Sequence, residues 1–238
     1  MLVNENLSLV RQQRPALEAR NLSVVRGNRV VIRAINLTLA EGEIVALVGS
    51  NGAGKTTLLQ CLAGAVRPAG GEVLWQGKVD RRCPAALRLV GFVGHESGLY
   101  LTLTARENLL FAGRMWGVDS PEERALEWLS LVGLEDQARQ TTAQLSRGMR
   151  QRLAIARALI HDPIVVLLDE PFTNLDGDGR KWLTAFLRDL RRRNRAVLLA
   201  AHESPAGGFV DRLVCLQAHG LREMQPSPRP KLCDNLSA

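Results

Sequence analysis

The sequence has no apolar run long enough to cross a membrane and no apolar segment of the signal-peptide kind near its start. No window holds the ~18 uninterrupted apolar residues that a transmembrane helix needs. Residues 1–15 are mixed and polar, which is not the pattern of a secretion signal. We therefore expect a protein that stays in the cytoplasm.

Cysteine and aromatic residues are also scarce, and no internal repeat is visible. Aromatic residues make up only 4% of the chain. The four cysteines are scattered without a C-x-x-C pair, which fits reduced thiols rather than disulfides or a zinc site; they are Cys61, Cys83, Cys215 and Cys233. With 238 residues, 46% of them hydrophobic, the chain can form one large domain, or a domain with a subdomain, around its own core.

Positive charge is in excess, with 31 basic against 24 acidic residues and a net charge of +7. Part of it gathers near the end of a predicted helix, at Arg188, Arg191, Arg192, Arg193 and Arg195. One interpretation is a solvated helix face whose charge complements the helix C-terminus. The other is attraction to an anionic surface, either membrane lipid or nucleic acid. Charge alone does not separate the two.

The most specific motif is a glycine-rich loop of the form G-x-x-x-x-G-K-[ST] between an apolar run, 44–48, and a predicted helix. It consists of Gly49, Ser50, Asn51, Gly52, Ala53, Gly54, Lys55, Thr56 and Thr57. Glycines let backbone N–H groups turn inward around phosphate oxygens, and the helix dipole adds positive potential. Lys55 can reach the β- and γ-phosphates, and the Thr56 hydroxyl can ligate Mg²⁺. The loop therefore predicts binding of a nucleoside triphosphate with magnesium.

A second motif places two adjacent carboxylates at the end of a predicted buried strand. The apolar run 164–168 is followed directly by Asp169 and Glu170, at the strand edge where α/β sheets bind ligands. Asp169 is expected to hold Mg²⁺ beside Thr56. Glu170 is expected to polarise the attacking water as a general base. Together with the loop, the pair predicts hydrolysis of the bound nucleotide.

A third motif, residues 145–151, precedes a strong helical run. Ser146 is a natural N-cap, so this segment is another helix N-terminus that can face an anion. A simple phosphate-loop kinase does not need such a second site about 20 residues before its carboxylates.

The remaining pattern predicts an α/β core with an antiparallel β subdomain and an α-helical subdomain. Strands are predicted at 17–25, 29–39, 43–48, 72–75, 87–93, 164–168 and 196–201, and helices at 55–65, over much of 103–160, and around the apolar positions Trp182, Leu183, Phe186 and Leu190. Residues 68–71 predict a turn. Thr104 with Glu107, and Ser120 with Glu123, predict capping boxes, the second with Pro121 at the first helical position.

In these three motifs the chain resembles the ATP-binding cassette (ABC) family of P-loop NTPases over residues 17–222, with residues 145–149 in place of the family's Leu-Ser-Gly-Gly-Gln signature. The resemblance implies an ABC ATP-binding domain at 17–224, with a helical subdomain at about 96–160. The composition of the two ends predicts a flexible extension at 1–16 and a disordered tail at 225–238. The resemblance implies ATP and Mg²⁺ as ligands. It also implies that Ser146 and Gly148 of one subunit close on the γ-phosphate bound to the other, within a homodimer or a pair of cassettes.

Other family positions can be matched singly. Residues 172–176 are similar to the D-loop, which crosses the dimer interface, and His202 is similar to the switch histidine that contacts the γ-phosphate. His95 stands where the family has its Q-loop glutamine, so it is a candidate for catalysis or for contact with the metal. Arg26 stands where an aromatic residue usually stacks on adenine, and its guanidinium can stack there instead.

The signature carries two replacements, and two histidines match no position of the family. Arg147 and Met149 replace a glycine and the glutamine of the signature. His161 and His219 match nothing and are interpreted as surface residues.

A single cassette without a membrane span implies a separate transmembrane permease, on which the chain lies peripherally at the cytoplasmic face of the inner membrane. About 90 residues separate Lys55 from Ser146, too few for the long coiled coil of chromosome-maintenance members. We therefore favour a transport ATPase, with no nucleic-acid partner, over a soluble ATPase acting on nucleic acid or ribosomes. Residues 94–109 are similar to a segment of the haem-exporter ATPases of cytochrome c maturation, so we favour haem export. The alternative is another exporter, since residues 145–151 are similar to signatures of multidrug and polysaccharide exporters.

Overall fold

The structure, a computed structural model, describes residues 15–77, 84–173, 175–205, 207–217 and 220–224. The predicted tail, most of the predicted extension, Cys83, Cys233, His219 and the D-loop residue Asn174 lie outside these ranges. The strands are β1 (Pro15–Arg26), β2 (Arg29–Ala40), β3 (Ile44–Val48), β4 (Gly70–Trp75), β5 (Val90–Val93), β6 (Val165–Asp169), β7 (Ala196–Ala201), β8 (Arg212–Gln217) and β9 (Gly220–Met224). The helices are α1 (Lys55–Leu62), α2 (Pro84–Leu87), α3 (Ala105–Met115), α4 (Pro121–Leu131), the 3-10 turn η1 (Thr142–Gln144), α5 (Arg147–Leu159) and α6 (Gly177–Arg192).

The central sheet has the strand order β5-β6-β7-β3-β8-β9, and only the β8–β9 pair is antiparallel. Every residue of β3 and β6 is buried. Except for Asp169, the alternate side chains of these strands enter two different hydrophobic cores. In β3, Ile44 and Ala46 face the core shared with α5 and α6, while Val45 and Leu47 face the core beneath the second sheet. This burial on both faces explains the unbroken apolar runs.

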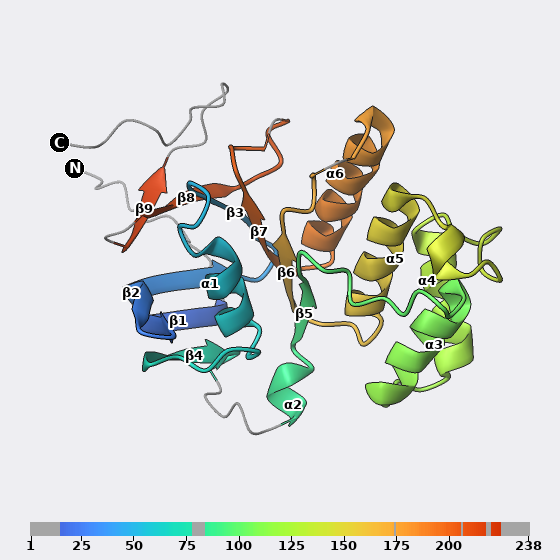
Figure 1. Cartoon of the computed structure of the whole chain (residues 1–238), viewed down its shortest axis with the longest axis horizontal. Coiled ribbons are helices and arrows are strands. Elements are labelled where there is room, and N and C mark those ends of the chain that lie inside the picture. Colours follow the sequence, from blue (N-terminus) through green and yellow to red (C-terminus); the bar gives the residue numbers. More distant parts are fainter. Residues whose placement is uncertain (1–14, 78–83, 174, 206, 218–219, 225–238) are drawn as a thin grey trace, which may run out of the picture.

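The second sheet is antiparallel, in the order β2-β1-β4. Helix α1 packs between the two sheets, as Figure 1 shows, and its Leu58, Leu59 and Leu62 are fully buried there. On the other side of the central sheet, α3, α4 and α5 form a helical layer (Figure 1). The predicted class, an α/β core with an antiparallel β subdomain and an α-helical subdomain, is confirmed.

The predicted capping boxes differ in outcome. At α3, the Glu107 backbone N–H donates to Thr104 Oγ1 (3.2 Å), and the Thr104 N–H donates to the Glu107 carboxylate (2.8 Å), which confirms the first box. At α4 the second box is wrong. Ser120 has a left-handed backbone, φ +47, and its side chain does not cap the helix, although Pro121 does open it.

Several predicted boundaries also change. Helix α1 ends at Leu62 rather than residue 65, because Gly64 adopts φ +78. Leu87 ends the unpredicted helix α2, so β5 begins only at Val90. Strand β1 begins at Pro15, two residues inside the predicted extension, and β4 takes up half of the predicted 68–71 turn. Strands β8 and β9 were not predicted.

Candidate functional site

The glycine-rich loop lies between the carboxyl end of β3 and the start of α1. A Cβ added to Gly49 would lie 2.7 Å from the carbonyl oxygen of Leu216. Gly54 adopts φ +102, and a Cβ added there would lie 2.8 Å from Val31 Cγ1, so both positions need glycine. No side chain caps α1 within the described residues, so its first N–H groups remain available to an anion. The loop geometry therefore fits a phosphate group.

The side chain of Lys55 reaches back to this loop. Its side chain is buried, and Nζ donates to the carbonyl oxygens of Gly49 (2.7 Å) and Ser50 (3.1 Å). Carbonyl oxygens are weak partners for an ammonium group compared with phosphate oxygens. The lysine is thus held in place and can exchange these contacts for a phosphate.

Asp169 is the buried carboxylate of the site, with only 6% of its surface exposed. Neither of its oxygens completes a hydrogen bond to a described residue. Burial raises the pKa of Asp169 above its ordinary value, and the neighbouring Glu170 contributes to the rise. The Thr56 hydroxyl, His95 and Lys55 act in the opposite direction. A buried carboxylate without a partner beside a threonine hydroxyl is a donor set that fits Mg²⁺, which prefers such oxygen ligands.

Glu170 lies next to His202. Its Oε1 is 2.9 Å from His202 Nε2, and its Oε2 accepts a longer bond, 3.4 Å, from the Thr173 hydroxyl. The Glu170 backbone has φ +50, an uncommon conformation that costs free energy and is often found at active sites. The structure thus brings together two residues predicted from separate strands. Thr173 belongs to the predicted D-loop, but its contact with Glu170 was not predicted, although its position three residues after Glu170 could have indicated it.

His95 shares a cavity of about 290 Å³ with both carboxylates. Arg147 and Arg150 of the third motif line the same cavity. Sequence reasoning did not anticipate that these arginines would lie close to the carboxylates of their own subunit.

The third motif forms the start of α5. The hydroxyl of Ser146 accepts a bond from the Met149 N–H (3.2 Å), which confirms the predicted N-cap. A Cβ added to Gly148 would meet no atom within 4 Å, and Gly148 does not have a positive φ. The subunit's own packing therefore gives no reason for a glycine here.

Arg26, the predicted adenine contact, lies at the end of β1. Its Nη2 donates to Gln60 Oε1 on α1 at 2.6 Å. The guanidinium is thus placed beside α1, the helix that the glycine-rich loop opens.

The arginine cluster of α6 is largely paired within the chain. Arg191 contacts Asp211 (2.8 Å), Arg193 contacts Asp189 (2.8 Å), and Arg195 contacts Asp162 (2.7 Å). Arg188 donates to the Gly207 carbonyl oxygen at 3.0 Å. These contacts favour the interpretation as a solvated helix face over an anion-binding surface.

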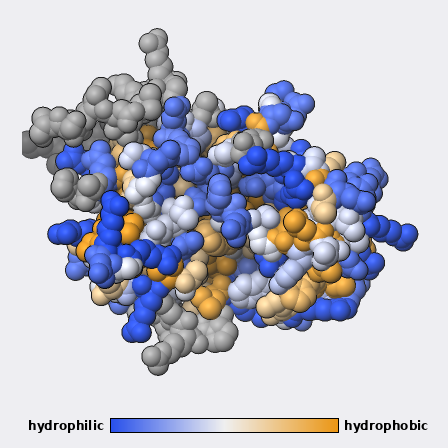
Figure 2. Space-filling view, viewed as in Figure 1, coloured by the Kyte–Doolittle hydropathy of each residue, from blue (hydrophilic) through white to orange (hydrophobic). Residues whose placement is uncertain are grey.

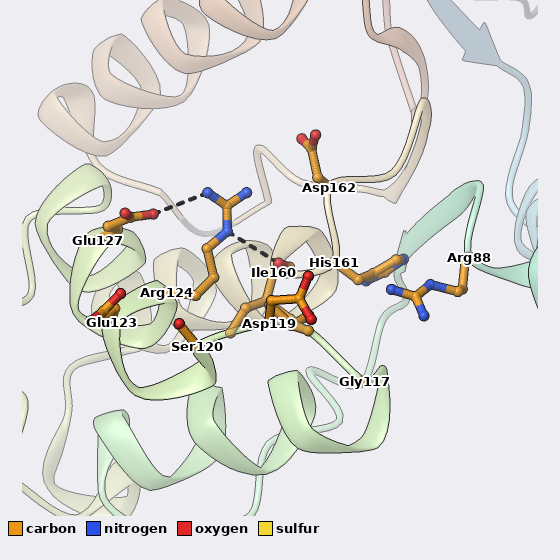
Figure 3. Close-up of a pocket in the computed structure, with 11 residues that line it drawn as sticks. Arg88, Gly117, Asp119, Ser120, Glu123, Arg124, Glu127, Ile160, His161 and Asp162 are labelled. Carbon is orange, nitrogen blue, oxygen red and sulfur yellow. Dashed lines mark hydrogen bonds and ion pairs between the residues drawn. The ribbon is translucent and has the colours of Figure 1, made fainter.

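A separate cavity of about 420 Å³ lies between the α3–α4 connection and the end of α5 (Figure 3). Arg88 and Arg124 line it together with several carboxylates. Arg124 donates hydrogen bonds to the Glu127 carboxylate and to the Ile160 carbonyl oxygen. No group of three potential metal ligands is found among the described residues. His161, at its edge, is not the surface residue that was predicted: it is partly buried and stacks on Trp116 at 4.2 Å.

This burial makes His161 a source of acid sensitivity. Burial lowers the pKa of His161 to about 4 from an ordinary 6.5; nearby Arg88 also lowers it, while the Val90 carbonyl and Asp162 act in the opposite direction. Because the unfolded chain takes up this proton at a higher pH, the contribution of His161 favours unfolding as pH falls from about 6.5 to about 4.

We therefore expect His161→Phe, which keeps a ring against Trp116, to lose less stability than the wild type in that window. The free energy of unfolding by urea, measured for both chains at pH 7.5 and pH 5, checks this. The titration of the carboxylates is common to both chains, so its contribution cancels when the two free energies of unfolding are subtracted. If the free energies of unfolding of the two chains differed by the same amount at pH 7.5 and at pH 5, the expectation would be contradicted.

Comparisons with known proteins agree with this geometry. Residues 32–173 match the family described as ABC transporter. The chain is 40% identical to the ABC transporter ATP-binding protein NatA of Bacillus subtilis (strain 168) over 164 residues, 67% of each chain. It is 42% identical to the cytochrome c biogenesis ATP-binding export protein CcmA of Salmonella typhi over 170 residues, 71% of this chain and 80% of CcmA.

Among solved structures, the chain is similar to the dimeric ATP-binding cassette MJ0796, in a post-hydrolysis state bound to ADP and Pi. The TM-score is 0.76 at 26% identity, covering 92% of this chain and all of that one. None of the helices that the structure describes combines the length and hydrophobicity needed to cross a bilayer.

Proposed function

The chain belongs to the ABC transporter family, and from this premise we propose that it is the ATP-hydrolysing subunit of a transporter that exports haem for cytochrome c biogenesis. The ATPase part rests on one observation above the others. The unpartnered carboxylate of Asp169 and the Glu170–His202 pair both lie at the carboxyl ends of central strands, next to the glycine-rich loop.

Each side chain then has a role in hydrolysis. Residues 49–57, which include Lys55, bind the phosphates of ATP, and Arg26 contacts the base. Asp169 and Thr56 would hold Mg²⁺, with His95 close by; when bound, the ion neutralises charge on the phosphate oxygens. Glu170 orients and deprotonates the attacking water, and His202 holds the Glu170 carboxylate and contacts the γ-phosphate.

The second anion site indicates that two copies act together. Ser146 shapes the start of α5, and the space that a Cβ on Gly148 would occupy is open. A partner's γ-phosphate can approach this glycine without displacing any atom of the subunit. We therefore place Ser146 and Gly148 against the ATP of a second cassette.

An apolar surface offers a contact for the permease. Exposed hydrophobic residues gather before and along α3, namely Tyr100, Leu101, Phe111 and Met115, and Met115 is 70% exposed. Met115 lines a groove of about 410 Å³ with Leu87, Phe92 and Trp116. Figure 2 shows apolar surface on the face that carries α2 and α3. The groove includes Ala112 and Met115 of α3, which follow residues 96–107. We infer that this part of the helical subdomain contacts the permease, with the chain lying peripherally on the cytoplasmic side of a membrane.

The similarity to NatA, at 40% identity against 42% for CcmA, favours one alternative, an ABC transporter with a different cargo. A gene-deletion strain separates the two. If the proposal holds, the strain loses covalently attached haem in its c-type cytochromes, and the wild-type gene restores it. Met115→Glu is expected to fail to restore it while keeping the ATPase activity of the purified chain.

Leu131→Glu is the matched control, since Leu131 is also exposed, at 43%, but lies on α4. Full c-type cytochromes in the deletion strain would overturn haem export. Normal restoration by Met115→Glu would overturn the assignment of the permease contact.

A further inference from the structure

A segment of nine residues, 203–211, joins His202 to strand β8. Among its described residues, 203–205 and 207–211, there is neither helix nor strand. Gly207 and Gly208 both adopt positive φ angles, +108 and +59. Glycine is the residue with the largest backbone freedom in the unfolded and locally open chain. Contacts with other elements must therefore keep His202 at 2.9 Å from Glu170.

The strongest of these contacts is made by Phe209. It is only 2% exposed and belongs to the core shared with Leu183 and Leu187 of α6. Its ring lies 5.8 Å from the ring of Phe172, tilted by 48°, within the range of favourable aromatic pairs. Phe172 comes two residues after Glu170. The aromatic pair thus connects the segment after the general base to the segment after its histidine.

Two arginines of α6 hold the same segment from outside. Arg188 donates to the Gly207 carbonyl oxygen (3.0 Å). Arg191 contacts Asp211 at 2.8 Å, and Asp211 in turn accepts from the Ile44 N–H (2.9 Å) and donates its own N–H to the Ile44 carbonyl (2.8 Å). The end of the segment is therefore tied both to α6 and to β3, the strand that carries the glycine-rich loop.

We propose that Phe209, assisted by Arg188 and Arg191, is a positioning residue for ATP hydrolysis: it keeps His202 in contact with Glu170. This proposal rests on the proposed roles of Glu170 and His202 in hydrolysis. Phe209 carries most of the effect because its contact is buried, whereas exposed polar and ionic contacts contribute little each. In this arrangement Arg188 and Arg191 of the arginine cluster have a function within the chain.

The test compares kcat and KM for ATP in Phe209→Leu and Arg188→Met. A shift of about 1 Å at a reacting group can cost roughly 10²-fold in rate, so we expect kcat to fall about tenfold or more in Phe209→Leu and less in Arg188→Met. KM is expected to stay within about twofold of the wild type, since neither residue belongs to the phosphate loop. Arg188→Lys, which keeps a donor, is expected to restore kcat.

A second comparison separates positioning from general loss of structure. In a His202→Ala background, Phe209→Leu is expected to cause no further fall in kcat, because residues acting through one another are not additive. Phe186→Leu and Arg192→Met are controls that remove an aromatic ring and a charge from α6 elsewhere, and both should keep kcat. If Phe209→Leu folds poorly, Phe209→Met and Arg188→Met carry the same test.

The outcomes distinguish the two proposals. Wild-type kcat in Phe209→Leu and Arg188→Met, or an equal fall with and without His202, would overturn the positioning role while leaving the catalytic assignment standing. Wild-type kcat in Glu170→Gln and His202→Ala would overturn both.

Discussion

Replacing Glu170 by Gln is expected to lower ATP hydrolysis about 10²- to 10⁴-fold, the usual contribution of a general base. The amide keeps the size of the side chain and can still accept a hydrogen bond from His202, whose Nε2 lies 2.9 Å from the carboxylate in the wild-type chain. It cannot take a proton from water. The measurement is phosphate release by the purified chain at saturating ATP and Mg²⁺. Glu123→Gln, which changes an exposed carboxylate on α4, is the control and should keep the wild-type rate.

The same variant also reports on assembly. Since ATP is retained when its hydrolysis is blocked, two Glu170→Gln chains are expected to remain joined around it. Light scattering should then show monomers without nucleotide and dimers with ATP and Mg²⁺. Persistent monomers under both conditions would count against sites shared between two subunits, and an unchanged hydrolysis rate would remove Glu170 from the catalytic role.

The parts of the fold that the sequence predicts best are those whose pattern reflects burial on both faces. Strands β3, β6 and β7 are short apolar runs because their alternate residues face two cores. The glycine-rich loop and Ser146 were also predictable, since backbone geometry fixes their residue types locally. Glu170 and His202 could be paired only through the family resemblance, because 31 intervening residues separate them.

The parts that escaped prediction depend on partners distant in the sequence. Nothing near Arg191 indicates that Asp211 will neutralise it, and nothing near His161 reveals the stacked ring of Trp116. Strand β8 pairs with β3, far earlier in the chain, and carries β9 at the sheet edge. Ser120 failed as a cap because its left-handed backbone directs the side chain away from the helix N–H groups. In each case a tertiary contact or a local conformation overrides the sequence pattern.

Two inactive variants are expected to restore activity when they are mixed. Lys55→Ala removes the ammonium that binds the phosphates of its own subunit. Gly148→Asp introduces a negative charge where an added Cβ meets no atom of the subunit, and an acidic residue near the start of α5 is compatible with the helix dipole. The Gly148→Asp chain should therefore fold and bind ATP normally, while repelling the γ-phosphate of a partner.

In a heterodimer of the two variants, one composite site combines the intact Lys55 of one chain with the intact Gly148 of the other. If chains pair at random, half of the dimers are mixed and each has one intact site of two, so an equimolar mixture should recover about a quarter of wild-type hydrolysis. Gly148→Ala, which adds the Cβ without the charge, is the matched control and should lose far less activity alone. A mixture as inactive as its components would mean that the start of α5 does not act on the partner's ATP. Recovery can arise only if each ATP lies between the glycine-rich loop of one chain and the serine-capped helix of another.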